Sequence, residues 1–290
     1  MSTIFVDPGA TSGSNNGSSW TNAYTSLQTA LSAMSATITK VCVRSSTGSI
    51  AVTSGLTANP SGVTGSNLWA EVVGCVYIAS NAPGYSDTYE TELPVGQYIA
   101  LDGGGTLDNT SILTIQTGNL QKWKNLFFTN MKVGAGASTS NRCVYFSNGG
   151  GTNLTNVVFQ NCKFSIAYRA IHYATTNNSL ISKLFFFDCV FENTTDILFN
   201  FACSVGYVTF ERCSFKAIST SVVAINMAVD GMLVVRDSIF YQASTAINLT
   251  SGTVLVRNSV FRNVAVGVST NGSNAVKSVE NCIFQHHIWH

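Results

Sequence analysis

A six-residue pattern that returns six times in the second half of this chain constrains its fold more than any other feature. The copies occupy residues 159–164, 186–191, 210–215, 235–240, 256–261 and 279–284. Equivalent positions in successive copies lie 21 to 27 residues apart, and a weaker seventh copy is read at residues 128–133. Sequences that repeat with such periods form stacked structural units, and these lengths match one coil of a parallel β-helix.

Each hexapeptide places mostly apolar or small residues at positions one, four and six, and mostly polar residues at positions two and three. A bend between positions three and four is needed to point the first group inward, and an Asn or Asp often sits there. A second apolar strand recurs at residues 170–173, 196–199, 223–226, 246–249 and 266–269, each followed by a turn and another β-rich run. The chain is therefore predicted to be all-β, a right-handed, single-stranded parallel β-helix with three strands per coil.

Equivalent side chains should form ladders, because neighbouring coils lie about 4.8 Å apart. The sixth position predicts an aromatic ladder of Phe164, Phe191, Phe215, Phe240, Phe261 and Phe284. The fourth position predicts a ladder that contains Cys162, Cys189, Cys213 and Cys282, with Met131, Ser238 and Ser259 in other coils. This variety favours packing over chemistry. Because no secretory signal is evident, we expect the thiols to be reduced.

The repeat predicts one domain over residues 1–290. Residues 1–40 are expected to hold an N-terminal strand and a capping helix, because an amphipathic face runs through residues 19–35. The side chains of that face are Trp20, Tyr24, Leu27, Leu31 and Met34. Residues 41–127 should form early coils with an insertion near 80–93, and residues 128–290 the regular coils. No cap is evident after the last hexapeptide, so a partner chain is expected to cover that end.

Composition narrows the possible partners. Charged residues make up only 10% of the chain and the net charge is +1, with no cluster of Lys and Arg. We therefore expect no nucleic-acid partner. No signal peptide and no apolar stretch long enough to cross a membrane is evident, so we expect no membrane partner and synthesis in a host cytoplasm.

Acidic residues are the natural candidates for catalytic groups, since glycoside hydrolases act through paired carboxylates. Within the repeat, Glu211 precedes Arg236 by one coil and Arg257 precedes Glu280, while Asp188 and Asp237 flank Arg212. This arrangement predicts cross-strand ion pairs rather than catalysis. Glu192 and Asp196 remain the weak alternative for a catalytic pair. No cofactor is expected.

Two further segments carry candidate binding residues. The insertion contains Tyr85, Asp87, Tyr89 and Glu90, which are expected to contact a glycan or a partner if the loop is not simply solvated. The C-terminal His286, His287 and His290 are a weak alternative for a metal site, because three-fold association would bring them together. A tail that lines an interface is the more economical interpretation.

The segments 5–9, 16–20 and 23–28, together with the repeated Asn-Cys-x-Phe coils, resemble the pectate-lyase-like right-handed β-helix superfamily. The resemblance spans nearly the whole chain, and its character is closest to bacteriophage virion and tailspike-type members. It implies the β-helix fold but leaves function open, because the superfamily holds polysaccharide lyases, glycoside hydrolases, bacterial surface proteins and virion proteins. Trimeric assembly is common among the phage members.

These observations lead to one main functional prediction and one alternative. The main prediction is a non-enzymatic structural virion protein, such as a capsid decoration (cement) protein or tailspike-like module. It would be a homotrimer that contacts other virion proteins such as the major capsid protein. The alternative is a polysaccharide lyase, a glycoside hydrolase or a glycan-binding module that acts on cell-surface polysaccharide.

Overall fold

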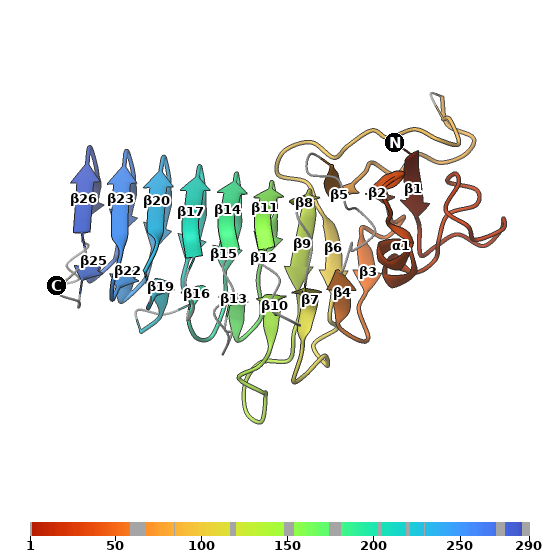
Figure 1. Ribbon diagram of the computed structural model, residues 1–290. Coiled ribbons are helices and arrows are strands. Elements are labelled where there is room, and N and C mark those ends of the chain that lie inside the picture. Colours follow the sequence, from red (N-terminus) through yellow and green to blue (C-terminus); the bar gives the residue numbers. More distant parts are fainter. Residues whose placement is uncertain are drawn as a thin grey trace.

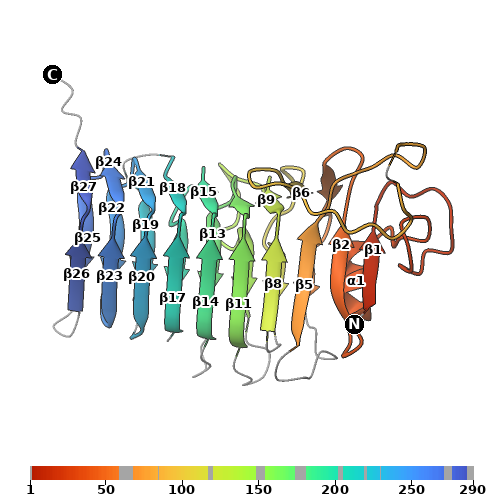
Figure 2. The ribbon, with the colours of Figure 1, turned by 90° about the horizontal axis from the view of Figure 1, so that it is seen from above.

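The computed structural model is a parallel β-helix, and the predicted fold class is confirmed. It describes residues 2–58, 68–83, 85–116, 120–147, 154–173, 181–201, 205–218, 221–228, 230–270 and 276–285. Within these ranges, three all-parallel sheets of ten, nine and eight strands run the length of a rod, with one strand of each sheet in every regular coil. Figure 1 shows the rod from the side and Figure 2 shows it from above.

The three sheets are named A, B and C in the order in which the chain visits them. Sheet A contains β1 (Ser2–Val6), β2 (Ile38–Val43), β5 (Trp69–Gly74), β8 (Leu120–Lys124), β11 (Leu154–Gln160), β14 (Ile181–Phe187), β17 (Val205–Glu211), β20 (Met232–Arg236), β23 (Thr253–Arg257) and β26 (Val276–Glu280). Sheet B contains β3 (Ser49–Ala51), β6 (Ile99–Asp102), β9 (Leu126–Thr129), β12 (Lys163–Phe164), β15 (Val190–Glu192), β18 (Ser214–Lys216), β21 (Ile239–Tyr241), β24 (Val260–Arg262) and β27 (Ile283–Gln285). Sheet C contains β4 (Leu56–Ala58), β7 (Ser111–Ile115), β10 (Arg142–Phe146), β13 (Arg169–Tyr173), β16 (Phe199–Phe201), β19 (Val223–Met227), β22 (Thr245–Leu249) and β25 (Val266–Thr270).

The hexapeptide spans the corner between sheets A and B, and its third residue makes the bend. That residue has a positive φ in every coil from β8 onward. The column consists of Asn125, Asn161, Asp188, Arg212, Asp237, Asn258 and Asn281, with φ between 48° and 59°. Asn and Asp adopt this left-handed conformation more readily than other non-glycine residues. The local preference of the sequence therefore sets the corner that turns both strands around the core.

Phenylalanine rings form a continuous file inside the rod. Successive rings from Phe128 through Phe164, Phe191, Phe215, Phe240, Phe261 and Phe284 stack with centroids 4.6 to 5.1 Å apart and planes within 9° of parallel. A second file from sheet A, formed by Phe159, Phe186 and Phe210, stacks at 5.2 and 4.9 Å. Rings of the two files meet edge to face. Both contact geometries are favourable for aromatic pairs, so the core combines stacked and T-shaped contacts.

The seventh hexapeptide lies five residues earlier than predicted. Phe128 stacks on Phe164, the sixth position of its copy, while Trp123 pairs in register with Phe159, the first position. The true copy is therefore residues 123–128, with Asn125 at the bend. The prediction failed because both segments contain Phe and Asn near one another, and only the strand register distinguishes the two frames.

One strand of sheet C also differs from the prediction. The pattern aligned residues 196–199 with 170–173, whereas Tyr173 pairs in register with Phe201. The strand β16 begins only at Phe199, because residues before it form a turn that is fixed by hydrogen bonds from Asp196 N to Tyr168 O and from Thr195 N to Ala167 O. Because side chains of a strand alternate with a period of two, this shift of two residues leaves Phe199 and Phe201 pointing into the core.

The N-terminal cap contains a shorter helix than the amphipathic pattern indicated. The helix α1 (Leu27–Ala33) begins after Ser26, whose hydroxyl accepts a hydrogen bond from Thr29 N. Leu27, Ala30 and Leu31 of α1 are buried against the first coil. Trp20 and Tyr24 are packed too, but they lie in the preceding loop, where Tyr24 forms a bridge to β1. Tyr24, Leu27, Leu31 and Met34 pack against the main core as the predicted face requires, whereas Trp20 packs in a separate cluster with Phe5 and Cys42, and the first turns of the predicted helix are loop.

The cysteines of the fourth column are free thiols inside the rod. Cys162, Cys189 and Cys213 are buried in consecutive coils, and their thiols donate to backbone carbonyls of neighbouring strands. Burial, followed by contacts with the two flanking thiols, raises the pKa of Cys189 well above its ordinary value. A neutral buried thiol is a poor nucleophile, so this column acts in packing. Cys282, in the last described coil, is only partly buried.

Candidate ligand groove on the outer face of sheet A

A groove of about 500 Å³ crosses the outer face of sheet A. Its lining comes from four neighbouring strands and one turn. The lining residues are Trp69 and Glu71 of β5, Lys122 of β8, Val158 and Gln160 of β11, Phe187 of β14, and Arg212 after β17. These positions are separated by up to 143 residues in the chain (212 minus 69), and coil stacking brings them onto one surface.

The groove combines aromatic surface with polar groups. Trp69 is 38% exposed, and Phe187 is partly exposed, with its ring stacked 5.9 Å from Phe185. Between the two lie Gln160 and the ion pair in which Lys122 Nζ is 3.2 Å from Glu71 Oε1. Flat apolar rings together with a few oriented polar groups are typical of ligand sites that recognise uncharged polar molecules.

Arg212 lines one end of the groove in a conformation that is unusual for arginine. It occupies the bend column with φ 53°, where the other coils carry Asn or Asp. Its Nε donates to Asp188 Oδ1 at 2.7 Å and its Nη2 to Asp188 Oδ2 at 3.1 Å, while its Nη1 contacts Glu211. These contacts, first of all the hydrogen bond to Asp188, raise the pKa of Arg212 above its ordinary value. A non-glycine residue held in the left-handed region often marks a functional position.

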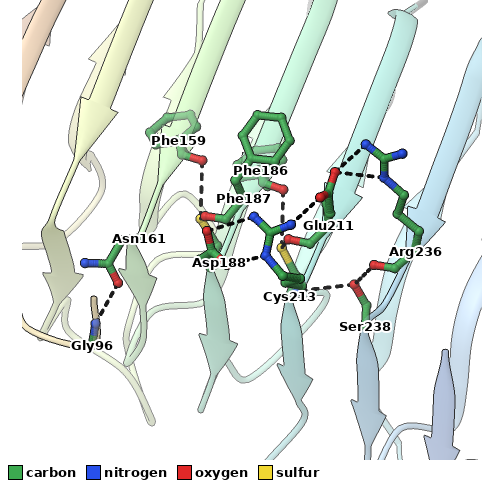
Figure 3. Close-up of polar contacts among 12 residues, drawn as sticks. Gly96, Phe159, Asn161, Phe186, Phe187, Asp188, Glu211, Cys213, Arg236 and Ser238 are labelled. Carbon is green, nitrogen blue, oxygen red and sulfur yellow. Dashed lines mark hydrogen bonds and ion pairs between the residues drawn. The ribbon is translucent and has the colours of Figure 1, made fainter. Parts of the chain in front are cut away.

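Ion pairs continue along the rod from Asp188 through Glu211 to Arg236 (Figure 3), and the column then places Arg236 beside Arg257, two like charges. Arg236 Nε donates to Glu211 at 2.8 Å, and Arg257 Nε lies 3.0 Å from Glu280. Asp237 accepts from Asn258 instead of pairing with Arg212, so that part of the predicted charge column is wrong.

Glu192 and Asp196, the alternative catalytic pair, each have a cation of their own. Lys163 Nζ lies 2.8 Å from Glu192 Oε1, and Arg169 Nε lies 2.8 Å from Asp196 Oδ2. The two acids therefore belong to separate ion pairs between neighbouring coils. Neither residue lines the groove.

The insertion residues face the N-terminal cap. Asp87 Oδ1 accepts from Thr21 N and Thr21 Oγ1 at 2.7 Å and from Tyr85 OH at 2.9 Å. Burial acts to raise the pKa of Asp87, but hydrogen bonds from Ser19 and Thr21 lower it to about 2. The segment between β5 and β6 spans residues 75–98, wider than the predicted 80–93, and it loops back around the N-terminal end (Figures 1 and 2).

Tyr89 joins the insertion to a buried cation that sequence reasoning missed. Arg44 Nε donates to Asp7 Oδ2 at 2.8 Å and Arg44 Nη1 donates to Tyr89 OH at 2.8 Å, while the guanidinium lies 4.3 Å from the centre of the Trp20 ring and 5.0 Å from that of Tyr77. We call Asp7, Trp20, Arg44, Tyr77 and Tyr89 the Arg44 cluster. It fastens strand β1, the cap loop and the insertion to one another.

Lys40 and Glu90 form a further contact between the insertion and β2, with Lys40 Nζ 2.7 Å from Glu90 Oε2. All four predicted contact residues of the insertion thus take part in intramolecular contacts with the cap or with one another. Their side chains hold the loop in place, so a ligand would meet them only at their remaining exposed atoms.

The structure describes no candidate metal site among its placed residues. In the described ranges, no three His, Cys, Asp or Glu side chains are grouped closely enough to hold a metal ion. The predicted His286, His287 and His290 lie outside the described residues. The described segments contain no helix that is long and apolar enough to cross a bilayer, because their one helix, α1, has only seven residues.

Comparisons of the chain with protein-family models, with curated proteins and with solved structures found no match. The hexapeptide repeat did not predict the groove. The lining residues occupy outward-facing positions, and the repeat does not fix the residue type at those positions. The one hint was Arg212, which breaks the Asn/Asp rule of the third position.

Proposed function

We propose that this chain is a non-catalytic structural protein of a virion, such as a capsid decoration protein or a tailspike-like module, that assembles as a trimer. The observation that carries the proposal is the charge arrangement. Glu192, Asp196, Glu211 and Glu280 each form an ion pair with a cation of a neighbouring coil. Carboxylates that are neutralised in this way serve to hold coils together.

The surface of the last described coil supports assembly with another polypeptide. Within the described part of the chain, Phe284 stacks on Phe261 through one face only and is 58% exposed, and Val276 and Ile283 are exposed as well. Apolar side chains and open strand edges of this kind mark contacts with other polypeptides. The proposal takes the contact to be a neighbouring subunit of the same assembly.

Light scattering coupled to size exclusion tests the oligomeric state. The proposal expects a mass of three chains, and a replacement of Ile283 and Phe284 by Ser should reduce it to one chain without loss of β-structure. A strict monomer for the unchanged protein would contradict the trimer. Electron microscopy of the intact particle, with the chain located by a labelled antibody, tests the virion assignment separately.

The groove on sheet A favours a second candidate function, the binding of a glycan. Trp69 and Phe187 offer aromatic faces on which sugar rings can stack, and Gln160 and Lys122 offer hydrogen bonds to hydroxyl groups. This function is compatible with the first, because a structural protein on a particle surface can also hold a cell-surface polysaccharide. The resemblance to the pectate-lyase-like superfamily points to the same class of ligand.

A glycan array followed by tryptophan fluorescence titration tests this second candidate. Trp69→Ala should abolish binding, and Arg212→Asn should weaken it while restoring the residue type preferred at the bend. Trp20→Phe, in the Arg44 cluster and not among the groove's lining residues, is the control for fluorescence. Binding that survives Trp69→Ala would remove the groove from consideration. Release of reducing ends or unsaturated products from a bound glycan would instead establish the lyase or hydrolase alternative.

A further inference from the structure

A column of polar side chains runs up the outer face of sheet C, on a different sheet from the groove. Tyr145, His172, Asn200, Asn226 and Asn248 occupy equivalent positions in successive coils. The Tyr145 and His172 rings stack with centroids 6.0 Å apart. Asn200 Nδ2 lies 3.1 Å from His172 Nδ1, Asn226 Nδ2 donates to Asn200 Oδ1 at 2.8 Å, and Asn248 Nδ2 donates to Asn226 Oδ1 at 2.9 Å.

The amides in this column all point the same way. Each Nδ2 is directed toward the preceding coil, so the positive ends of three aligned side-chain dipoles face His172. With Asn200 as donor, His172 Nδ1 is the acceptor and its proton resides on Nε2. The pKa of His172 is lowered to about 3, first by burial and then by the charges of Arg142 and Arg169. The imidazole is therefore neutral in a positive field.

Two arginines at the start of the same strands create that field. Arg142 of β10 and Arg169 of β13 are partners in register, so like charges lie one coil apart. Arg169 is neutralised by Asp196 at 2.8 Å. Among the described residues Arg142 has no carboxylate partner, its Nε is buried without a hydrogen bond, and its guanidinium packs 4.5 Å from the centre of the Tyr145 ring. Burial and then Arg169 lower the pKa of Arg142.

This arrangement is unfavourable for the protein alone. Like charges on directly opposed residues repel, and a buried N–H group without an acceptor lacks the interaction that it would have with water. An oxyanion placed at the two guanidinium groups would reduce the repulsion and would give the buried N–H an acceptor. Arginine forms paired hydrogen bonds with carboxylate, sulfate and phosphate groups. The charged groups that face this place in the described structure are Arg142, Arg169 and Asp196, with neutral Tyr145 and His172 beside them.

We propose that Arg142, assisted by Arg169 and His172, binds the oxyanion group of a ligand on the outer face of sheet C. The ligand carries a carboxylate, sulfate or phosphate, and its uncharged part extends along the ladder of Asn200, Asn226 and Asn248. The site is separate from the groove on sheet A and holds whether or not the groove binds a glycan.

Isothermal titration calorimetry with three probes tests the site and distinguishes the possible anions. The probes are glucuronate, sulfate and phosphate, each at matched ionic strength in sodium chloride, so that general screening is constant. The unchanged protein should bind at least one probe saturably and melt at a higher temperature in its presence. The probe that binds most tightly identifies the oxyanion.

Arg142→Met is the decisive variant and Arg262→Met is its matched control. Arg262 also has a buried Nε without a partner and packs 5.4 Å from an aromatic ring, that of Tyr241, but it faces Tyr241 and Gln285 in place of a second arginine. Arg142→Met should weaken probe binding about tenfold or more, as expected for loss of a charge-assisted hydrogen bond. Arg262→Met should leave binding unchanged.

A readout without ligand distinguishes a binding residue from a structural one. If Arg142 serves to bind a ligand, the Arg142→Met protein without ligand should have the same melting temperature as the unchanged protein or a higher one, because the repulsion between Arg142 and Arg169 is removed. A lower melting temperature together with unchanged probe binding would overturn the proposal. The absence of saturable binding of all three probes to the unchanged protein would also overturn the proposal. Neither result would affect the test of the sheet A groove.

Arg142→Lys is the second variant, for the case that Arg142→Met does not fold. It keeps the charge and should bind the probes more weakly. Unchanged binding by Arg142→Lys would count against the site.

Discussion

The two halves of the rod are held together in different ways. From β11 to β27 the Phe file continues from coil to coil, and the thiols of Cys162, Cys189 and Cys213 occupy equivalent positions in three consecutive coils. Around β1, β2 and β5, contacts occur only once: Arg44 joins Asp7, Trp20 and Tyr89, which lie far apart in the chain. The regular half distributes its stability over equivalent rungs, whereas the N-terminal half depends on a few particular side chains.

The largest expected effect tests the regular half. Phe215→Ala should lower the free energy of unfolding by about 3 to 5 kcal/mol, the usual range when a buried phenylalanine is truncated. The ring is buried between Phe191 and Phe240, at 5.0 and 4.6 Å, so a cavity remains. Urea unfolding followed by circular dichroism measures the change.

Phe284→Ala is the matched control in the same file, because its ring stacks on one neighbour only and is largely exposed. It should cost about 1 kcal/mol. Equal losses at the two positions would mean that the aromatic file does not stabilise the rod by burial.

Tyr89→Phe tests the N-terminal half by removing one oxygen. The hydroxyl accepts from Arg44 Nη1 and Ile78 N and donates to Val76 O at 3.0 Å. Leaving these groups without a partner should cost about 1 to 3 kcal/mol. Limited proteolysis should show earlier cleavage within the insertion than in the regular coils.

Tyr85→Phe is the comparison variant, since its hydroxyl donates only to Asp87 near the surface. Its loss should be below that of Tyr89→Phe. If both variants resist protease as well as the unchanged protein, the Arg44 cluster does not fasten the insertion.

A pH dependence in the regular half depends on His172. Its unfolded form binds a proton as the pH falls below 6.5, whereas its folded form stays neutral down to about 3. The unfolded state therefore binds more protons across that window, and stability decreases as the pH is lowered, by up to about 1.4 kcal/mol per pH unit. His172→Asn, which continues the amide ladder, should flatten this slope above about pH 5, where carboxylates stay ionised. An unchanged slope would show that His172 is accessible to protons in the folded chain.

The smallest effect is expected for the exposed ion pairs. Glu192→Gln combined with Asp196→Asn should change the free energy of unfolding by about 0.2 to 1 kcal/mol for each pair, because both pairs lie near the surface. Any glycan-degrading activity of the protein should be unaltered by the double variant. A loss of such activity would return these acids to a catalytic role.

Sequence periodicity was sufficient to predict the coil, the aromatic file and most charge pairs of the regular half. It failed at the seventh copy, where Trp123 begins the hexapeptide and Phe128 ends it. It also failed at Asp237, whose neighbour in the structure is Asn258. A repeat identifies equivalent residues only where several copies agree. A single weak copy near an irregular turn can be aligned with the others in two different ways.

The candidate sites were harder to predict than the fold. The sequence left the insertion as either a solvated loop or a contact for a glycan or partner, whereas in the structure Tyr89 and Asp87 face the cap. Nothing local in the sequence of Trp69 or Arg142 marks a site, since outward positions of a strand carry no periodic constraint. Only their neighbours in adjacent coils give them a role.

The sequence by itself determined the winding of this chain. Recurring Phe residues, and Asn or Asp at every bend of the column except Arg212, favour the same local conformation, so the local preference and the global fold agree. The tertiary structure alone decided which outward side chains meet. Loops of different length separate the strands, so spacing in the sequence alone does not say which outward positions lie over one another. The groove on sheet A, the Arg44 cluster and the position of Arg142, which has no carboxylate partner in the described ranges, all follow from that stacking, because each brings together residues that are separated in the chain.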